Sequence, residues 1–274
     1  MSKTMAMKPK EVQLDRLTFS DVRSLPSGAK MVYINLNSNS LYVQTPELET
    51  PFDSVFYPDG SDENGKIPVN VSLKGHDESE KIGEFHDMLN KFDELVKSKC
   101  IENSVAWLKN KKMSLDTVSQ LYTDMVKVSV DPETGEPNGK YPPQFRFKVA
   151  KRNNKWECRF YDEHKTPLED IQVENLLKRG SKIKALLKCT GLWIAGGKFG
   201  CSWKAEQMIV NTPKTLDDYA FRSDDEDDEG GEDRQATQVE FVEDSSDDDS
   251  SDEEEEEVVE KPKKSTKSSK SKKR

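Results

Sequence analysis

The chain has 274 residues and carries 42 Lys+Arg against 52 Asp+Glu, for a formal net charge of −10. It contains no run of about 18 apolar residues and no apolar signal stretch near its start, so we expect an intracellular protein with no transmembrane helix and no membrane partner. Its four cysteines and three histidines lack the spacing of ligands, so we expect buried thiols in a reducing compartment, no metal site and no cofactor.

The first part of the chain is predicted to be a flexible N-terminus, residues 1–13, followed by a folded domain over residues 14–212. Short runs with alternating apolar and polar residues indicate strands at the start of this domain. The predicted strands are Leu14–Phe19, Met31–Leu36, Leu41–Gln44 and Lys66–Lys74. Asn37-Ser-Asn39 is typical of a hairpin turn between the second and third of these strands.

A helical insertion is predicted over residues of about 78–122. Within Glu78–Cys100, apolar residues recur at steps of three and four, which places them on one face of a helix. These residues are Ile82, Phe85, Leu89, Phe92 and Val96. We expect this face to lie against a sheet, and a partner-binding helix is the alternative. A second helix is predicted near Ser114–Tyr122, with Ser114 as its N-cap.

The strand pattern resumes after the helices. The predicted strands are Met125–Val130, Gln144–Ala150, Lys155–Tyr161, Ser181–Trp193 and Phe199–Val210. Asp131–Pro143 is rich in Gly and Pro and is predicted to be a loop. Asn153-Asn154 and Gly196-Gly197 are predicted hairpin turns, and Leu168–Arg179 is predicted to be a short helix that Gly180 ends.

The end of the chain reverses its charge twice. Residues 223–260 hold 21 Asp+Glu and one Arg, whereas residues 261–274 hold eight Lys+Arg and no acid. Blocks of like charge cannot collapse around a core. We therefore predict a disordered acidic tail over residues 213–260 and a disordered basic tip over residues 261–274. A folded body with such a tail is typical of proteins that bind another polyelectrolyte.

Residues 140–210 combine positive charge with aromatic rings, and hold 15 Lys+Arg against seven Asp+Glu. The predicted strands there have one apolar face and one basic face, and the basic faces of neighbouring strands would form a groove. We take the following residues as candidates for nucleic-acid binding: Arg146, Lys148, Lys151, Arg152, Lys155, Trp156, Arg159, Tyr161, Lys182, Lys184, Lys188, Trp193, Lys198, Trp203 and Lys204.

Such a groove suits single-stranded nucleic acid, because cations neutralise phosphates and exposed rings stack on unpaired bases. The alternative is that the rings fill the core and the lysines only keep the surface soluble. We assign Phe145, Phe147 and Phe199 to the core. The three tryptophans and Tyr161 remain open between the two interpretations, because they lie near turns or beside basic residues.

Enzymatic motifs are not found. Residues Gly191 to Lys198 contain three glycines and a lysine, but their spacing is not that of a phosphate-binding loop. Neither H-E-x-x-H nor G-x-S-x-G occurs. We therefore do not expect an enzyme.

The run from Gly191 to Val210, GLWIAGGKFGCSWKAEQMIV, resembles the last strand pair of a known family. This family comprises the single-stranded-DNA-binding proteins of large nucleocytoplasmic DNA viruses, which are similar in turn to that of the T-seven phage group. Tyr141–Val149 and Leu176–Ala185 also resemble the family. The resemblance is specific over residues of about 140–210.

The resemblance implies a mainly β fold: an elaborated five-stranded OB barrel with a capping helix between its third and fourth strands, followed by an acidic tail. It also implies that positions around Lys148–Tyr161 and Trp193–Lys204 lie near the DNA. In the family the tail contacts replication partners such as polymerase and helicase or primase, and competes with DNA for the groove. The phage protein ends its tail with an aromatic residue, whereas this chain ends in lysines and an arginine, and the only aromatic residue within residues 223–260 is Phe241.

Three functions are thus compatible with the sequence. The first is a sequence-nonspecific single-stranded-DNA-binding protein of viral DNA replication and recombination, at a replication site in the host nucleus or a cytoplasmic factory. The second is a chaperone for histones or other basic proteins, in which the acidic tail does the binding. The third is a scaffold or transcription accessory protein without direct nucleic-acid contact. A homodimer is compatible with each of them.

Overall fold

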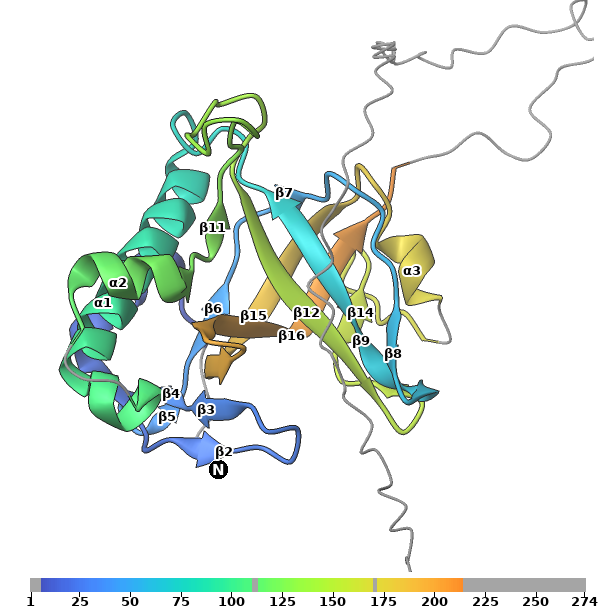
Figure 1. Cartoon of the computed structure of the whole chain (residues 1–274). Helices are drawn as coiled ribbons and strands as arrows, with labels where there is room; N and C mark the ends of the chain where they lie inside the picture. The colour runs from blue at the N-terminus through green and yellow to red at the C-terminus, as the bar shows by residue number, and fades with distance from the viewer. Residues whose placement is uncertain (1–5, 110–112, 170–171, 214–274) are drawn as a thin grey trace, which may run out of the picture. The chain divides into compact units, whose positions relative to one another are not determined.

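A computed structural model describes residues 6–109, 113–169 and 172–213 (Figure 1). All of them belong to one unit of the chain, Met1–Asp218. The predicted acidic tail and basic tip lie outside the described residues, apart from Pro213.

The structure contains three α-helices, two short 3-10 turns and sixteen strands in its described part. The helices are α1 (Glu80–Leu108), α2 (Leu115–Leu121) and α3 (Val173–Leu176), and the 3-10 turns are η1 (Pro9–Glu11) and η2 (Leu14–Arg16). The strands are β1 (Leu17–Phe19), β2 (Arg23–Ser24), β3 (Lys30–Val32), β4 (Ile34–Leu36), β5 (Asn39–Ser40), β6 (Tyr42–Gln44), β7 (Leu48–Glu49), β8 (Tyr57–Asp59), β9 (Ser61–Ser72), β10 (Tyr122–Thr123), β11 (Val126–Lys127), β12 (Gln144–Arg152), β13 (Lys155–Trp156), β14 (Arg159–Tyr161), β15 (Lys182–Ala195) and β16 (Lys198–Asn211). The fold is therefore mainly β, as the sequence predicted.

Strand pairing in the larger sheet leads back to its starting point. The strands β12, β9, β7, β15 and β16 follow one another as neighbours, and β16 pairs with β12 again. The β12–β16 pairing is parallel, whereas the other four pairings in this series are antiparallel. The strands β1, β4 and β5 form a separate three-stranded sheet.

The faces of these strands agree with the alternation in the sequence. The inward residues of β9, β12 and β15 are all buried, and include Ile67, Val69, Val71, Phe145, Phe147, Val149, Ile183, Ala185 and Leu187. Because side chains alternate along a strand, the residues between them point outward. The phases predicted for β12 and β15 are therefore confirmed, and so is the core assignment of Phe145, Phe147 and Phe199.

The predicted hairpin turns are also confirmed. Each turn has two consecutive residues in the left-handed region, as the type I′ turn requires. The φ values are 50° and 65° at Asn37 and Ser38, 48° and 58° at Asn153 and Asn154, and 56° and 81° at Gly196 and Gly197. The last two turns join β12 to β13 and β15 to β16.

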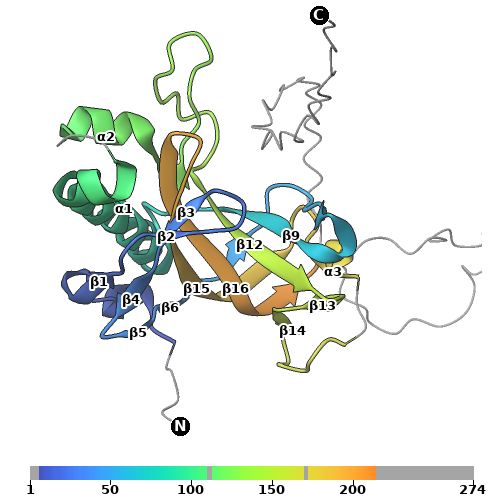
Figure 2. The ribbon, with the colours of Figure 1, turned by 60° about the horizontal axis from the view of Figure 1, so that its bottom comes forward.

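Helix α1 covers part of the sheet, as its apolar face predicted. Phe85 packs edge-on against Phe145 of β12, with ring centroids 5.5 Å apart, and Phe92 packs against Trp203 of β16 at 5.7 Å. Figures 1 and 2 both place α1 and α2 on one side of the strands and α3 on the other. The N-cap role of Ser114 is confirmed, because its hydroxyl accepts a hydrogen bond from the Thr117 amide.

A buried carboxylate ties α1 to the segment that follows it. Asp93 is 3% exposed, and it accepts hydrogen bonds from the Tyr122 hydroxyl and the Met125 amide. Burial raises the pKa of Asp93 to about 6, although both hydrogen bonds favour the charged form. The contact fixes the helix to the chain between α2 and β11.

The position of the long helix differs from the expectation. Helix α1 lies between β9 and β12, which would be the second and third strands of an OB barrel, not the third and fourth. Only the short α3 lies between β12 and β15. The sequence pattern locates the helix correctly along the chain but does not say which strands pair on either side of it.

Several predicted elements also need correction. The strand predicted at Met31–Leu36 divides into β3, which belongs to the larger sheet, and β4, which belongs to the smaller sheet. The N-terminal segment is fixed before residue 14, because the Met7 amide donates to the Tyr42 carbonyl at 3.1 Å and Pro9 is buried. A 3-10 turn replaces the start of the strand predicted from Leu14. The predicted strand at 155–161 divides into β13 and β14, which pair with different partners. The predicted helix at 168–179 shortens to α3, since the Leu168 amide bonds to the Phe160 carbonyl in an extended segment.

Candidate nucleic-acid interface

Three lysines from three neighbouring strands lie in register on the outside of the sheet. Lys148 of β12 is the register partner of Lys204 of β16, and Lys204 is in turn the partner of Lys188 of β15. Register partners point to the same side of a sheet, and neighbouring strands are about 4.8 Å apart. We call Lys148, Lys204 and Lys188 the lysine row.

The β12 end of the lysine row, at Lys148, favours an anion. Lys148 is half-buried, and within the described residues no carboxylate lies at ion-pairing distance from it. Burial is the largest cause that lowers the pKa of Lys148. The nearby charges of Lys66, Lys204 and Arg152 lower it further, whereas the charge of Glu157 raises it. A phosphate would relieve this repulsion, because an opposite charge at close range stabilises the ammonium form.

Two carboxylates already pair with Lys204, the middle residue of the lysine row. The Lys204 ammonium lies 3.1 Å from Glu157 Oε2 and 3.1 Å from Glu206 Oε1. Burial alone would lower the pKa of Lys204, but its hydrogen bonds to these two carboxylates raise it. Glu157 Oε1 also lies 3.3 Å from Arg152 Nε, so Glu157 bridges two cations beside Lys148.

One aromatic ring lies at the β15 end of the lysine row, and two more lie on the opposite side of β12. Tyr42 of β6 is the register partner of Lys188, whose ammonium is 5.7 Å from the centre of the Tyr42 ring. On the opposite side of β12 from the row, Trp156 of β13 packs edge-on against Phe56, with ring centroids 5.8 Å apart. The Lys151 ammonium lies 5.4 Å from the Trp156 ring. Each of these ring groups therefore lies beside a lysine, an arrangement that suits bases next to phosphates.

Most of the other predicted residues lie on the strands that carry the row. Lys182 and Lys184 point outward from β15 on the same side as Lys188, and Arg146 points outward from β12, where its Nε donates to Asn70 Oδ1 at 2.7 Å. Lys155 and Arg159 are exposed on β13 and β14, and Tyr161 is half-buried on β14.

The structure separates three predicted residues from the row. Trp193 and Lys198 lie near the turn of the β15–β16 hairpin, about 15–20 Å along the strands from Lys188 and Lys204 at about 3.3 Å per residue. Trp203 is 2% exposed, and its indole Nε1 donates to the Met125 sulfur at 2.9 Å. Of the two interpretations left open for Trp203, the structure supports the core, because its ring is buried beside Phe92. Its place among the candidate binding residues is therefore withdrawn.

Sequence reasoning missed three residues of this surface: Lys66, Tyr42 and Glu157. The alternation of Lys66–Lys74 is a signal for the outward position of Lys66, because Ile67, Val69 and Val71 must face inward. The sequence carries no comparable signal for Tyr42 or Glu157, whose roles depend on which strands are neighbours.

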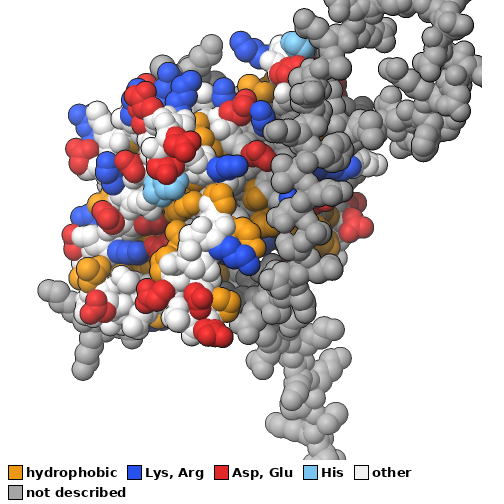
Figure 3. All heavy atoms as spheres, turned by 90° about the horizontal axis from the view of Figure 1, so that it is seen from above, with side chains coloured by type: hydrophobic (Ala, Val, Ile, Leu, Met, Phe, Trp, Pro, Cys, Tyr) orange, Lys and Arg blue, Asp and Glu red, His pale blue; other side chains and the backbone are white. Residues whose placement is uncertain are grey.

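One face of the molecule carries side chains of both charges. Among the uncovered atoms in Figure 3, basic and acidic side chains are interspersed around a central group of hydrophobic ones. Among residues 6–109, 113–169 and 172–213, no group of three or more His, Cys, Asp or Glu side chains is arranged to hold a metal ion. None of the helices in these ranges is both long and apolar enough to cross a bilayer.

Comparison with known proteins gives only distant likenesses. No protein-family model matches the chain, and no curated protein matches it. The single-stranded DNA-binding protein from bacteriophage Enc34, solved in complex with ssDNA, is 8% identical with a TM-score of 0.39, and the match covers 72% of this chain and 97% of that chain. The protein gp2.5, a single-stranded DNA binding protein encoded by bacteriophage T7, is 14% identical with a TM-score of 0.40, over 68% of this chain and 97% of that chain. We base no functional argument on likenesses this distant.

Proposed function

We propose that the folded body binds single-stranded DNA without marked sequence preference, and that the lysine row is the centre of the binding surface. The observation that carries this proposal is Lys148: a half-buried cation beside three other cations, with no carboxylate at ion-pairing distance among the described residues. A fold gains nothing from such repulsion on its own. A polyanion that crosses the sheet would neutralise it.

We further propose that the five strands of the pairing series form an OB barrel. Their mutual neighbours and the parallel β12–β16 pairing support this assignment. In OB folds, the face of the second and third strands binds oligonucleotides. Here those strands are β9 and β12, and their outward residues include Lys66, Arg146 and Lys148.

Single strands fit this surface better than duplex DNA. The row offers phosphate contacts, and Tyr42 beside Lys188 offers a half-buried ring for an unpaired base. Trp156 offers a second half-buried ring on the opposite side of β12. Sequence-specific duplex readers usually place a helix or ribbon in the major groove. The long helix α1, in contrast, turns its apolar face to the sheet.

We also propose a biological setting on the strength of the tail. The acidic stretch of residues 223–260 resembles a nucleic-acid strand in charge, so it would compete for the lysine row and, once displaced, contact basic surfaces of replication proteins. We propose that the protein acts, without catalytic activity, in viral DNA replication and recombination, at a replication site in the host nucleus or a cytoplasmic factory.

The test is a titration of the full chain with fluorescent single-stranded DNA, duplex DNA and RNA at several salt concentrations. We expect single strands to be preferred over duplex, and the affinity to fall with salt at a log–log slope of about −0.7 per phosphate neutralised. Lys148→Ala and Lys188→Ala should each weaken binding and make the slope shallower by up to about one unit. Lys91→Ala on the exposed side of α1 is the matched control and should change neither.

Two results would overturn the proposal: a preference for duplex, or Lys148 and Lys188 variants that behave like the Lys91 control. Deletion of residues 223–274 separates it from the chaperone function. The deletion should retain or strengthen DNA binding, whereas a chaperone that works through its acidic tail would lose activity.

A further inference from the structure

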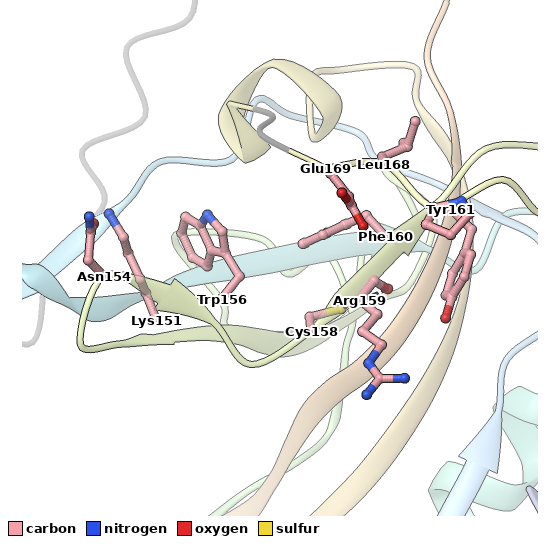
Figure 4. A pocket seen from close by; sticks show the side chains of 10 residues that line it. Lys151, Asn154, Trp156, Cys158, Arg159, Phe160, Tyr161, Leu168 and Glu169 are labelled. Carbon is pink, nitrogen blue, oxygen red and sulfur yellow. Dashed lines mark hydrogen bonds between the residues drawn. The ribbon is translucent and has the colours of Figure 1, made fainter.

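An open cavity of about 640 Å³ lies beside Trp156, at the end of the β12–β13 hairpin (Figure 4). Lys151, Asn154 and Trp156 line one side of it, and Leu168 and Glu169 line the other, with Phe160 between them. Its volume is in the range of small-molecule pockets. Figure 4 shows Trp156 and Phe160 pointing toward this space, while Arg159 points to the other side of β14.

The Trp156 ring is held in place by its neighbours. Its edge-on contact with Phe56 has an interplanar angle of 82°, and the Lys151 ammonium lies within 5.5 Å of both ring centres. A fixed, half-buried indole beside a cation is a ready platform for a flat aromatic group that carries a negative charge.

The opposite sides of the cavity carry polar side chains that can form hydrogen bonds with the edge of a flat aromatic ligand. Neither the Asn154 side chain nor the Glu169 carboxylate has a hydrogen bond or ion pair with another described residue. An amide can both donate and accept hydrogen bonds, and a carboxylate accepts them. The amino groups of cytosine, adenine and guanine are donors of the kind that Glu and Asp accept from cytosine in known complexes.

The cavity adjoins the lysine row but lies on the other side of β12. Lys151 and Lys148 are three residues apart, about 10 Å along the strand, and point to opposite sides of it. The register partner of Lys151 is Trp156 itself. A nucleic-acid strand on the row is therefore within reach of the cavity at the edge formed by β13.

We propose that this cavity receives one unstacked nucleobase of the bound strand, which stacks on Trp156, places its edge against Asn154 and Glu169, and holds its phosphate near Lys151. The inference rests on the proposed function and deepens it, because it assigns one nucleotide of the strand to a defined pocket. A base with an exocyclic amino group fits Glu169 better than thymine does.

The test uses the full chain and short oligo-dT strands that carry a single 2-aminopurine at successive positions. Stacking on an indole quenches 2-aminopurine, so we expect strong quenching at one or two positions only. Trp156→Ala should abolish this quenching and weaken binding about 5- to 150-fold with an unchanged salt slope. Trp156→Phe should restore part of both signals, and Glu169→Ala should reduce the preference for the amino-bearing base over thymine.

The matched control is Tyr141→Ala, because Tyr141 is an exposed ring with the Lys140 ammonium 5.2 Å from its centre. This variant should leave the quenching unchanged. Thermal unfolding of each variant separates loss of the pocket from loss of the fold, and Glu169→Ala tests the pocket without touching the core.

The outcomes distinguish the two proposals. If the wild-type chain binds no single-stranded DNA, the proposed function fails. If it binds, but the quenching is absent or persists in Trp156→Ala, the pocket is not a base site while the proposed function stands.

Discussion

Glu157→Gln should strengthen binding of single-stranded DNA. The Glu157 carboxylate forms ion pairs with Lys204 and Arg152, two cations that would otherwise contact phosphates. Its carboxylate lies 3.1 Å from the Lys204 ammonium and 3.3 Å from Arg152 Nε, directly beside the unpaired charge of Lys148. Any phosphate that approaches Lys204 or Arg152 must compete with this internal anion. Glutamine keeps the size and shape of the side chain but removes its charge.

The magnitude follows from how exposed these contacts are. The side chains are 18% exposed at Lys204, 76% at Arg152 and 32% at Glu157, so solvent screens both pairs. Partly exposed pairs of this kind contribute about 0.2–1 kcal/mol each. Release of two of them should favour DNA by about 0.5–2 kcal/mol, or about 2- to 30-fold in affinity. Each cation that gains a phosphate should also steepen the salt slope by about 0.7.

The assay is fluorescence anisotropy of labelled single-stranded DNA with the full chain, repeated over a series of salt concentrations. Glu94→Gln is the matched control, because it removes the same charge from an exposed position of α1. If Glu157→Gln binds no more tightly than Glu94→Gln at low salt, or more weakly than wild type, the carboxylate does not compete with DNA and the placement of phosphates on Lys204 and Arg152 is wrong.

Three further predictions concern stability. Trp203→Ala should destabilise the fold by about 3–5 kcal/mol in urea unfolding, because it empties a core position beside Phe92; a loss of DNA affinity without a loss of stability would return Trp203 to the interface. Gly191→Ala should lower the unfolding midpoint by an amount equivalent to about 1–3 kcal/mol or more, since φ is +118° and a Cβ would lie 2.5 Å from the Val32 carbonyl oxygen; an unchanged midpoint would contradict this packing. The stability of the wild-type chain should fall as pH rises from about 4 to about 6, because the folded pKa of Asp93 is raised and the folded state binds more protons than the unfolded state in that window. Asp93→Asn should remove this part of the pH dependence in the same urea experiment, and an identical pH profile for both chains would refute the role of Asp93.

The sequence predicts local features of this fold well. The three turns with paired left-handed residues are recognisable because Asn and Gly adopt that conformation at low cost. The buried faces of β12 and β15 follow from alternation alone. Alternation also places Trp203 on the core side of β16, opposite Lys204. The strand phase therefore predicts the burial of Trp203 better than its nearness to basic residues does.

Neighbour relationships are what the sequence does not predict. The contact between Lys148 and Lys204 joins two strands that are 56 residues apart, and it depends on a parallel pairing at one register position. No local pattern indicates that β14 leaves β12 to pair with β16, or that α1 enters between β9 and β12. The sequence therefore predicts which residue types form the candidate site. It does not predict that three lysines align in a row or that Glu157 pairs with one of them.

The order of the strands along the chain has a consequence for the time at which this surface comes into existence. Lys148, Lys188 and Lys204 lie on β12, β15 and β16, and β16 is the last strand in the described part of the chain. During synthesis the three lysines emerge from the ribosome one after another. The row forms only after β16 has emerged and paired with both β12 and β15. Until then the positive charges of the nascent protein are scattered, and the proposed binding surface for nucleic acid is not yet assembled.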